Sequence, residues 1–143
     1  MSQIIILPLL SALVAQTAKF FIQSNKIKFS FKNLTAYSGM PSGHVAMVVS
    51  LATIVGLQEG WDSSLFALAF VFAFLIIRDA IGLRQYLGRH GKILNALVKD
   101  LKEDDLLDEH YPRLIEKIGH TPAQALAGGI IGAAVSLIGY FLF

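Results

Sequence analysis

Four apolar stretches in this sequence each come close to the length needed to cross a lipid bilayer. They cover about residues 4–22, 41–60, 63–77 and 122–143. A helix rises 1.5 Å per residue, so a hydrocarbon core of about 30 Å takes roughly 20 residues. The third stretch reaches that length if it continues to Leu83. The sequence therefore predicts an all-α integral membrane protein with four transmembrane helices, at about 4–22, 41–60, 63–83 and 122–143.

Composition agrees with a membrane protein and excludes several other classes. Of 143 residues, 55% are hydrophobic and the mean hydropathy is +0.61, well above an ordinary soluble domain. The net charge of +2 is too small to suggest nucleic-acid binding. The absence of cysteine excludes disulfides, thiolate catalysis and cysteine metal sites. The first stretch lacks a basic start and a small-residue cleavage site, so we expect a retained helix and one transmembrane domain over 1–143.

The basic residues are distributed unevenly along the chain. All 12 Lys and Arg lie in or next to two connecting segments, at about 23–40 and 78–121, whereas the turn near residues 59–62 carries only Glu59 and Asp62. Basic loops stay on the cytoplasmic side of a cell membrane. We therefore predict that the first loop and the segment 84–121 are cytoplasmic and that both termini lie outside.

The long segment 84–121 contains an amphipathic pattern. Apolar residues recur at helical spacing between Gly91 and Glu103, as in a helix that lies against a membrane or against protein. They are Ile93, Leu94, Leu97, Val98 and Leu101. The acidic run that follows, residues 103–105, could attract Mg²⁺, but we favour a solvated turn.

The start of the second helix has the features of an anion site. Pro41 suits a first helical turn, Ser42 can cap the helix or bind an anion, and Gly43 allows close approach to the backbone. Free N–H groups and the helix dipole at such a start attract phosphate. His44 follows within one turn. The alternative is a capped helix start with an incidental histidine.

Further charged residues fall at the same membrane level. Lys19 near the end of the first helix is either a phosphate contact or a lysine reaching to the surface. Arg78 and Asp79 end the third helix, where they could form a structural ion pair. Arg84 follows, and the fork of an arginine suits phosphate oxygens. We favour Arg84 as the phosphate ligand, with Asp79 orienting a basic partner.

The segment Pro41–His44 resembles the second motif of type-2 phosphatidic acid phosphatases and vanadium-dependent haloperoxidases. More of the chain resembles the divergent branch of that family, the acid phosphatase/vanadium-dependent haloperoxidase-related membrane proteins. Five segments carry this resemblance in the family's order: 16–19, 39–46, 79–84, 88–89 with 94–95, and 119–122. The better-known relatives generally have six helices and a site facing away from the cytoplasm, so this chain departs from them.

Two histidines compete for the role of nucleophile. Arg84 and His90 reproduce the Arg-x5-His spacing of the third motif of the wider family, but Leu94 stands where an acid is expected. Gly-His-Thr-Pro is typical of the divergent branch, and it places His120 at the cytoplasmic start of the fourth helix. We therefore prefer His120 and keep His90 as the alternative. His110 matches no motif and is interpreted as a solvated loop residue.

The resemblance implies phosphoryl transfer through a phosphohistidine. His120 would attack phosphorus and His44 would protonate the leaving alcohol. The groups implied to bind the phosphate are Lys19, Ser42, Gly43 and Arg84, with Arg78 as a further candidate. No cofactor is expected because the cations supply the charge, although a dependence on Mg²⁺ stays open.

A site of cations and histidines at the lipid interface suits a substrate with a phosphate head and an apolar tail. Phosphatidylglycerophosphate or phosphatidic acid is the first choice, and an isoprenoid phosphate or diphosphate is the second. A non-enzymatic protein that binds lipid phosphates, or acts as a scaffold, is the rival. Small residues at Gly128, Gly132 and Ser136 predict close helix packing, either within the chain or in a homodimer through the fourth helix.

Overall fold

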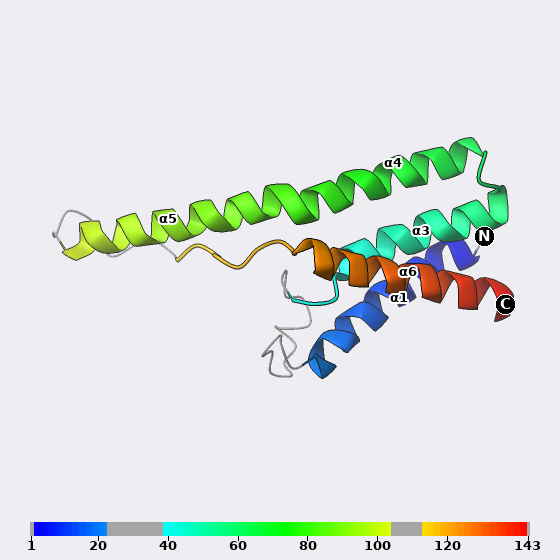
Figure 1. Ribbon diagram of the computed structural model, residues 1–143, viewed down its shortest axis with the longest axis horizontal. Helices are drawn as coiled ribbons and strands as arrows, with labels where there is room; N and C mark the ends of the chain where they lie inside the picture. The colour runs from blue at the N-terminus through cyan, green and yellow to red at the C-terminus, as the bar shows by residue number, and fades with distance from the viewer. Residues whose placement is uncertain (1, 23–38, 104–112, 143) are drawn as a thin grey trace.

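The computed structural model describes residues 2–22, 39–103 and 113–142, which form a bundle of long helices (Figure 1). In chain order the elements are α1 (Ser2–Phe21), α3 (Gly43–Glu59), α4 (Ser64–Arg78), the π-helix η2 (Asp79–Leu83), α5 (Arg84–Glu103) and α6 (Pro122–Leu142). The basic loop at 23–38, the acidic pair 104–105 and His110 lie outside the described residues.

The helices have the length and composition of membrane spans. Three are long and apolar enough to cross a bilayer, namely Gln3–Phe21, Ser64–Leu101 and Pro122–Leu142, and Gly43–Glu59 is a shorter apolar helix of 17 residues. The all-α membrane class predicted from the sequence is thereby confirmed. Both termini lie at one end of the bundle with the turn between α3 and α4, while α3 and α6 begin at the other end (Figure 1).

Helix α3 is the centre of the bundle and packs against α1, α4 and α6. Its contact with α6 is close because the residues of α6 that face α3 include glycines, which have no side chain to separate the two backbones. A Cβ on Gly128 would fall on the carbonyl oxygen of Ser42, and one on Gly132 would fall on that of Ala46. The hydroxyls of Ser50 and Ser136 are 2.7 Å apart in the same interface. The small residues of α6 therefore pack within the chain, and a homodimer through this helix would need its other residues.

The helix of the third predicted span does not end at Leu83. Helix α4 passes through the π-turn η2 directly into α5, so one continuous helix runs from Ser64 to Glu103. No proline lies between these residues, and the charged and amide residues that follow Leu83 are compatible with a helix. The 20 residues of α5 extend about 30 Å further along the helix. The helix predicted to start at Gly91 therefore starts earlier, at Arg84, as a direct continuation of η2.

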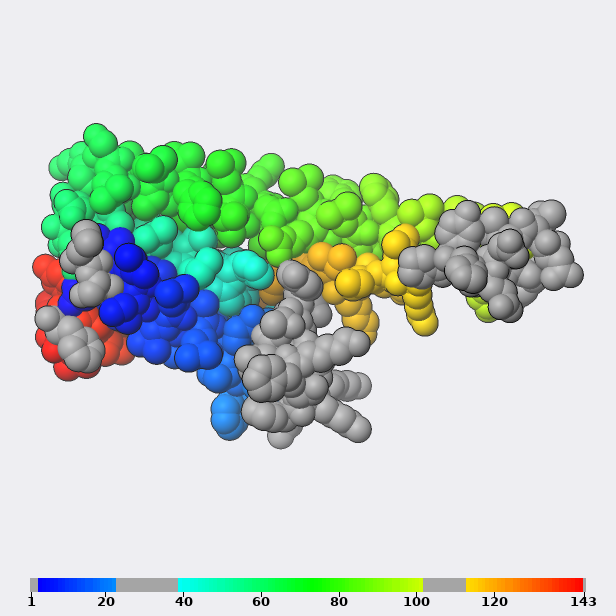
Figure 2. Space-filling model, turned by 180° about the vertical axis from the view of Figure 1, so that it is seen from behind, coloured from blue at the N-terminus to red at the C-terminus, as the bar shows by residue number. Residues whose placement is uncertain are grey.

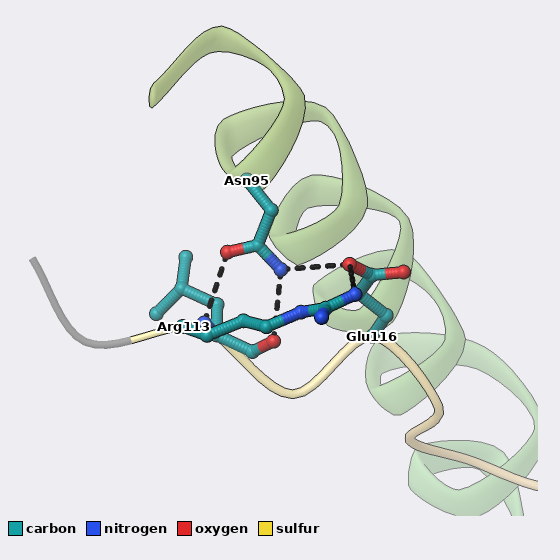
Figure 3. A network of polar contacts seen from close by, with 4 residues as sticks. Asn95, Arg113 and Glu116 are labelled. Carbon is teal, nitrogen blue, oxygen red and sulfur yellow. Dashed lines mark hydrogen bonds and ion pairs between the residues drawn. The ribbon is translucent and has the colours of Figure 1, made fainter. Parts of the chain in front are cut away.

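One face of α5 holds the chain that returns toward α6. Residues 113–118 run beside α5, where a Cβ on Gly88 would lie 2.5 Å from the carbonyl oxygen of Glu116. The amide of Asn95 fixes this contact, since its Nδ2 donates to the carbonyl of Leu114 and to Glu116 Oε1, both at 2.9 Å (Figure 3). Its Oδ1 accepts the Leu114 N–H at 2.9 Å. The helix predicted over 91–103 is confirmed as part of α5, but the face that contacts protein is the small and polar one, and the apolar residues Ile93, Leu94, Leu97 and Leu101 are exposed.

Candidate functional site

The start of α3 is capped as the sequence predicts. Ser42 is the N-cap, and its hydroxyl accepts the Val45 N–H at 3.4 Å. The Ser42 N–H donates to the carbonyl of Gln124 in the first turn of α6, at 3.1 Å. These two bonds fix the beginnings of α3 and α6 side by side. The first N–H groups of a helix, here those of Gly43 and His44, have no acceptor within the helix and are suited to an anion.

Gln16 of α1 lies against this helix start. A Cβ on Gly43 would be 3.3 Å from Cδ of the Gln16 side chain, so glycine is what lets the two helices meet here. Within the described part of the chain, Gln16 Oε1 is buried without a hydrogen-bond partner. Sequence reasoning assigned Gln16 no role. Residues three apart share a helix face, so the position of Gln16 one helical turn before Lys19 could have indicated that both side chains face the same site.

His120 is held by its backbone and leaves its ring unpaired. Its N–H donates to the carbonyl of Ala80 at 2.9 Å, and its carbonyl accepts from Gln85 Nε2 at 2.6 Å. The residue is 1% exposed, yet neither Nδ1 nor Nε2 has a hydrogen-bond partner among the residues that the structure places. Buried polar atoms are rarely left unpaired, so such a ring suggests a site for a ligand.

The turn around His120 is built by local signals. Gly119 has φ of +94°, a conformation that favours glycine, and a Cβ there would lie 2.9 Å from the Gln85 nitrogen. Thr121 and Gln124 form a reciprocal cap: Gln124 N–H donates to Thr121 Oγ1 at 3.3 Å, and Thr121 N–H donates to Gln124 Oε1 at 3.0 Å. Helix α6 then begins at Pro122, as predicted.

Charged groups from α1, α3 and α5 change the pKa of the His120 ring. Burial, and after it the positive charges of Lys19, His44 and Arg84, together lower the pKa of its imidazole to about 4. Lys19 is 2% exposed, so it is buried in the bundle and does not extend to the surface. The imidazole of His120 is therefore neutral at pH 7, with a nitrogen lone pair available for attack.

Asp79 and Arg84 form an ion pair across the π-turn. Arg84 Nε donates to Asp79 Oδ2 at 2.6 Å, and both side chains are partly buried. Residues five apart do not meet on an α-helix, but the i to i+5 repeat of a π-helix brings them together. The carboxylate thus orients an arginine that has further N–H donors for an anion. Arg78 is exposed, and the partner of Asp79 in this structure is Arg84.

His90 stands apart from this group. It is exposed on α5, six residues beyond Arg84 and so about 9 Å further along the helix. The structure accordingly gathers Lys19, His44, Arg84 and His120, and leaves His90 outside. Across residues 2–22, 39–103 and 113–142, no group of three or more His, Asp or Glu side chains could hold a metal ion.

The fold and this group of residues define an all-helical membrane protein with a cationic, histidine-containing site where its helices begin and end. The chain belongs to the Divergent PAP2 family, whose model matches residues 1–135. It is 36% identical to the "Uncharacterized membrane protein YuiD" of Bacillus subtilis (strain 168), over 95% of each chain. No solved structure matches it. The family resemblance seen in the sequence motifs is therefore confirmed.

Burial of a neutral His120 should make stability depend on pH. The ordinary pKa of 6.5 applies to the unfolded chain and about 4 to the folded protein, so the unfolded state binds the proton first as pH falls. We expect the free energy of unfolding to decrease between pH 6.5 and 4, by about 3 kcal/mol from this group. The measurement is the thermal midpoint in detergent against pH, for wild type and His120→Gln. Equal slopes for the two proteins in this window would contradict the assignment.

Proposed function

We propose that this protein is a membrane lipid-phosphate phosphatase that hydrolyses a phosphomonoester through a phosphohistidine. The observation that carries the proposal is the buried His120 ring, whose two nitrogens lack a hydrogen-bond partner within the described chain. The cationic side chains of Lys19 and Arg84 act on this ring. A phosphoryl group between them would supply the missing partner and the opposite charge.

The first step forms a bond between nitrogen and phosphorus. A ring nitrogen of His120 attacks phosphorus as the bond to the lipid oxygen breaks, and protonated His44 gives its proton to the departing alkoxide. Lys19, Arg84 and the N–H groups that begin α3 neutralise the equatorial oxygens. Asp79 contributes by fixing Arg84 through the 2.6 Å ion pair.

The second step returns the enzyme to its starting state. Water attacks the phosphohistidine, gives a proton to His44, and displaces the ring nitrogen, so that inorganic phosphate leaves. The unpaired Oε1 of Gln16, beside Gly43, is suited to accept a hydrogen bond from this water or from a substrate hydroxyl. Gln16 is thus proposed as a positioning residue for the second step.

The site's place at the ends of spanning helices favours an amphiphilic substrate. A phosphate head would reach the cations while an apolar tail stays in lipid. Phosphatidylglycerophosphate and phosphatidic acid are the first candidates, and an isoprenoid phosphate or diphosphate is the second. The distribution of basic residues supports a site at the cytoplasmic face of the cell membrane with both termini outside, and reporters fused to the termini can test this orientation.

The decisive experiment is phosphate release by the purified protein in detergent from a panel of these lipids, with Mg²⁺ or with EDTA. We expect turnover of at least one lipid phosphate, and retention of activity in EDTA because Lys19 and Arg84 supply the positive charge. Binding of the lipids without any release would favour the rival function, a lipid-phosphate-binding or scaffold protein.

A further inference from the structure

A row of exposed leucines runs from the end of η2 along α5, on a face that the returning chain leaves uncovered. The row consists of Leu83, Leu87, His90, Leu94, Leu97 and Leu101. Its leucines are between 39% and 66% exposed, and His90 is exposed as well. The residues that hold the returning chain, Gly88, Gly91 and Asn95, lie on a different face of the helix. We refer to this row of six residues as the α5 seam.

The spacing of the seam indicates what covers it. Successive members are separated by four, three, four, three and four residues. This is the heptad repeat of a coiled coil, in which every second interval brings a side chain back to the same line on the helix. A globular surface or a lipid layer does not require that alternation, whereas a second helix packed along α5 does.

The height of the seam argues against lipid as its cover. Helix α4 and η2 together have 20 residues, or about 30 Å, which is the thickness of the hydrocarbon core. Leu101 lies 18 residues beyond Leu83, about 27 Å further along the same helix. Figures 1 and 2 show α5 extending away from the rest of the bundle. With residues 64–83 filling the hydrocarbon core, most of the seam lies beyond it.

We propose that the α5 seam pairs with the seam of a second copy of this chain, as a parallel two-stranded coiled coil. Two copies inserted in one membrane have the same orientation, so their α5 helices rise in the same direction and equal residues meet at equal heights. The pairing forms a closed two-fold dimer whose axis follows the membrane normal. His90 then faces its counterpart within an otherwise leucine seam, and a polar residue at one core position fixes the register.

The chain has no cysteine, so single introduced cysteines test this pairing without background. In membranes treated with a mild oxidant, Leu94→Cys and Leu97→Cys should convert most of the protein to a disulfide-linked dimer, because each meets its own counterpart. The matched controls Lys92→Cys and Ala96→Cys are on the same two turns of α5 but outside the seam. We expect these controls to cross-link at least 10-fold more slowly.

Equal cross-linking at all four positions, or none at the seam, would overturn the proposal. Absence at the seam together with protection of these cysteines from a water-soluble maleimide would show instead that α5 lies on lipid. A second measurement uses Leu94→Asp with Leu97→Asp in detergent, where light scattering should report a fall from the dimer mass to the monomer mass. An unchanged mass would also contradict the coiled coil. Neither measurement depends on phosphatase activity.

Discussion

Replacing His120 by asparagine is expected to reduce phosphate release by roughly 10³-fold or more. Asparagine keeps a small polar side chain in the pocket, but its amide nitrogen cannot form the bond to phosphorus. The backbone bonds of His120 to Ala80 and Gln85 do not involve the ring, so the turn before α6 should persist. Activity is measured on the lipid phosphate that the wild-type protein turns over fastest, with the thermal midpoint in detergent as a check on folding.

The same assay decides between the two candidate nucleophiles. His90→Ala should keep most of the activity, since His90 lies exposed about 9 Å along the helix from Arg84. Rapid quenching of the wild-type protein with labelled substrate should trap phosphate on protein in an acid-labile, base-stable linkage, and His120→Asn should trap none. An inactive His90→Ala beside an active His120→Asn would assign the nucleophile to His90 and refute the mechanism proposed here.

Local signals explain why the sequence predicts most of the site. Ser42 before α3, and Thr121 with Pro122 before α6, are residues whose chemistry defines a helix start over a few positions. Helix length and the distribution of charge then bring these starts to one end of the bundle. The grouping of Lys19, His44, Arg84 and His120 follows from those two features, and in the structure the first three lie close enough to His120 to lower the pKa of its imidazole.

Features that depend on distant contacts were not predictable in the same way. The π-turn at 79–83 changes which residues share a face, and only then do Asp79 and Arg84 meet. The sequence does not predict that α4 continues into α5. A charged stretch after an apolar one indicates where a membrane span ends, but it does not indicate whether the helix ends there as well. Gln85 supports His120 from 35 residues away, and nothing near it in sequence indicates this bond.

Adding one methyl group to Gly128 should destabilise the whole bundle. In Gly128→Ala the new Cβ would fall on the Ser42 carbonyl oxygen and lie 3.2 Å from the Ser42 nitrogen, and these are backbone atoms that no rotamer change can move. A Cβ added to Gly132 would likewise fall on a backbone atom, the carbonyl oxygen of Ala46. Overpacking of this kind typically costs 1–3 kcal/mol. The double variant Gly128→Ala with Gly132→Ala should therefore lower the thermal midpoint in detergent much more than an ordinary surface change.

Gly129→Ala is the matched control because it adds the same methyl group to the same helix one residue away. Its Cβ would lie 3.7 Å from Val49 Cγ2, an ordinary contact, and alanine in a helix is favoured over glycine by about 0.5–1 kcal/mol. Its midpoint should be equal to or above that of wild type. Because the Ser42 N–H bonds to Gln124 across the same interface, separation of α3 from α6 would also move the N–H groups that begin α3, the proposed phosphate contacts, away from His120. Gly128→Ala should thus lose activity along with stability, whereas equal midpoints for Gly128→Ala and Gly129→Ala would show that the two helices are not in backbone contact.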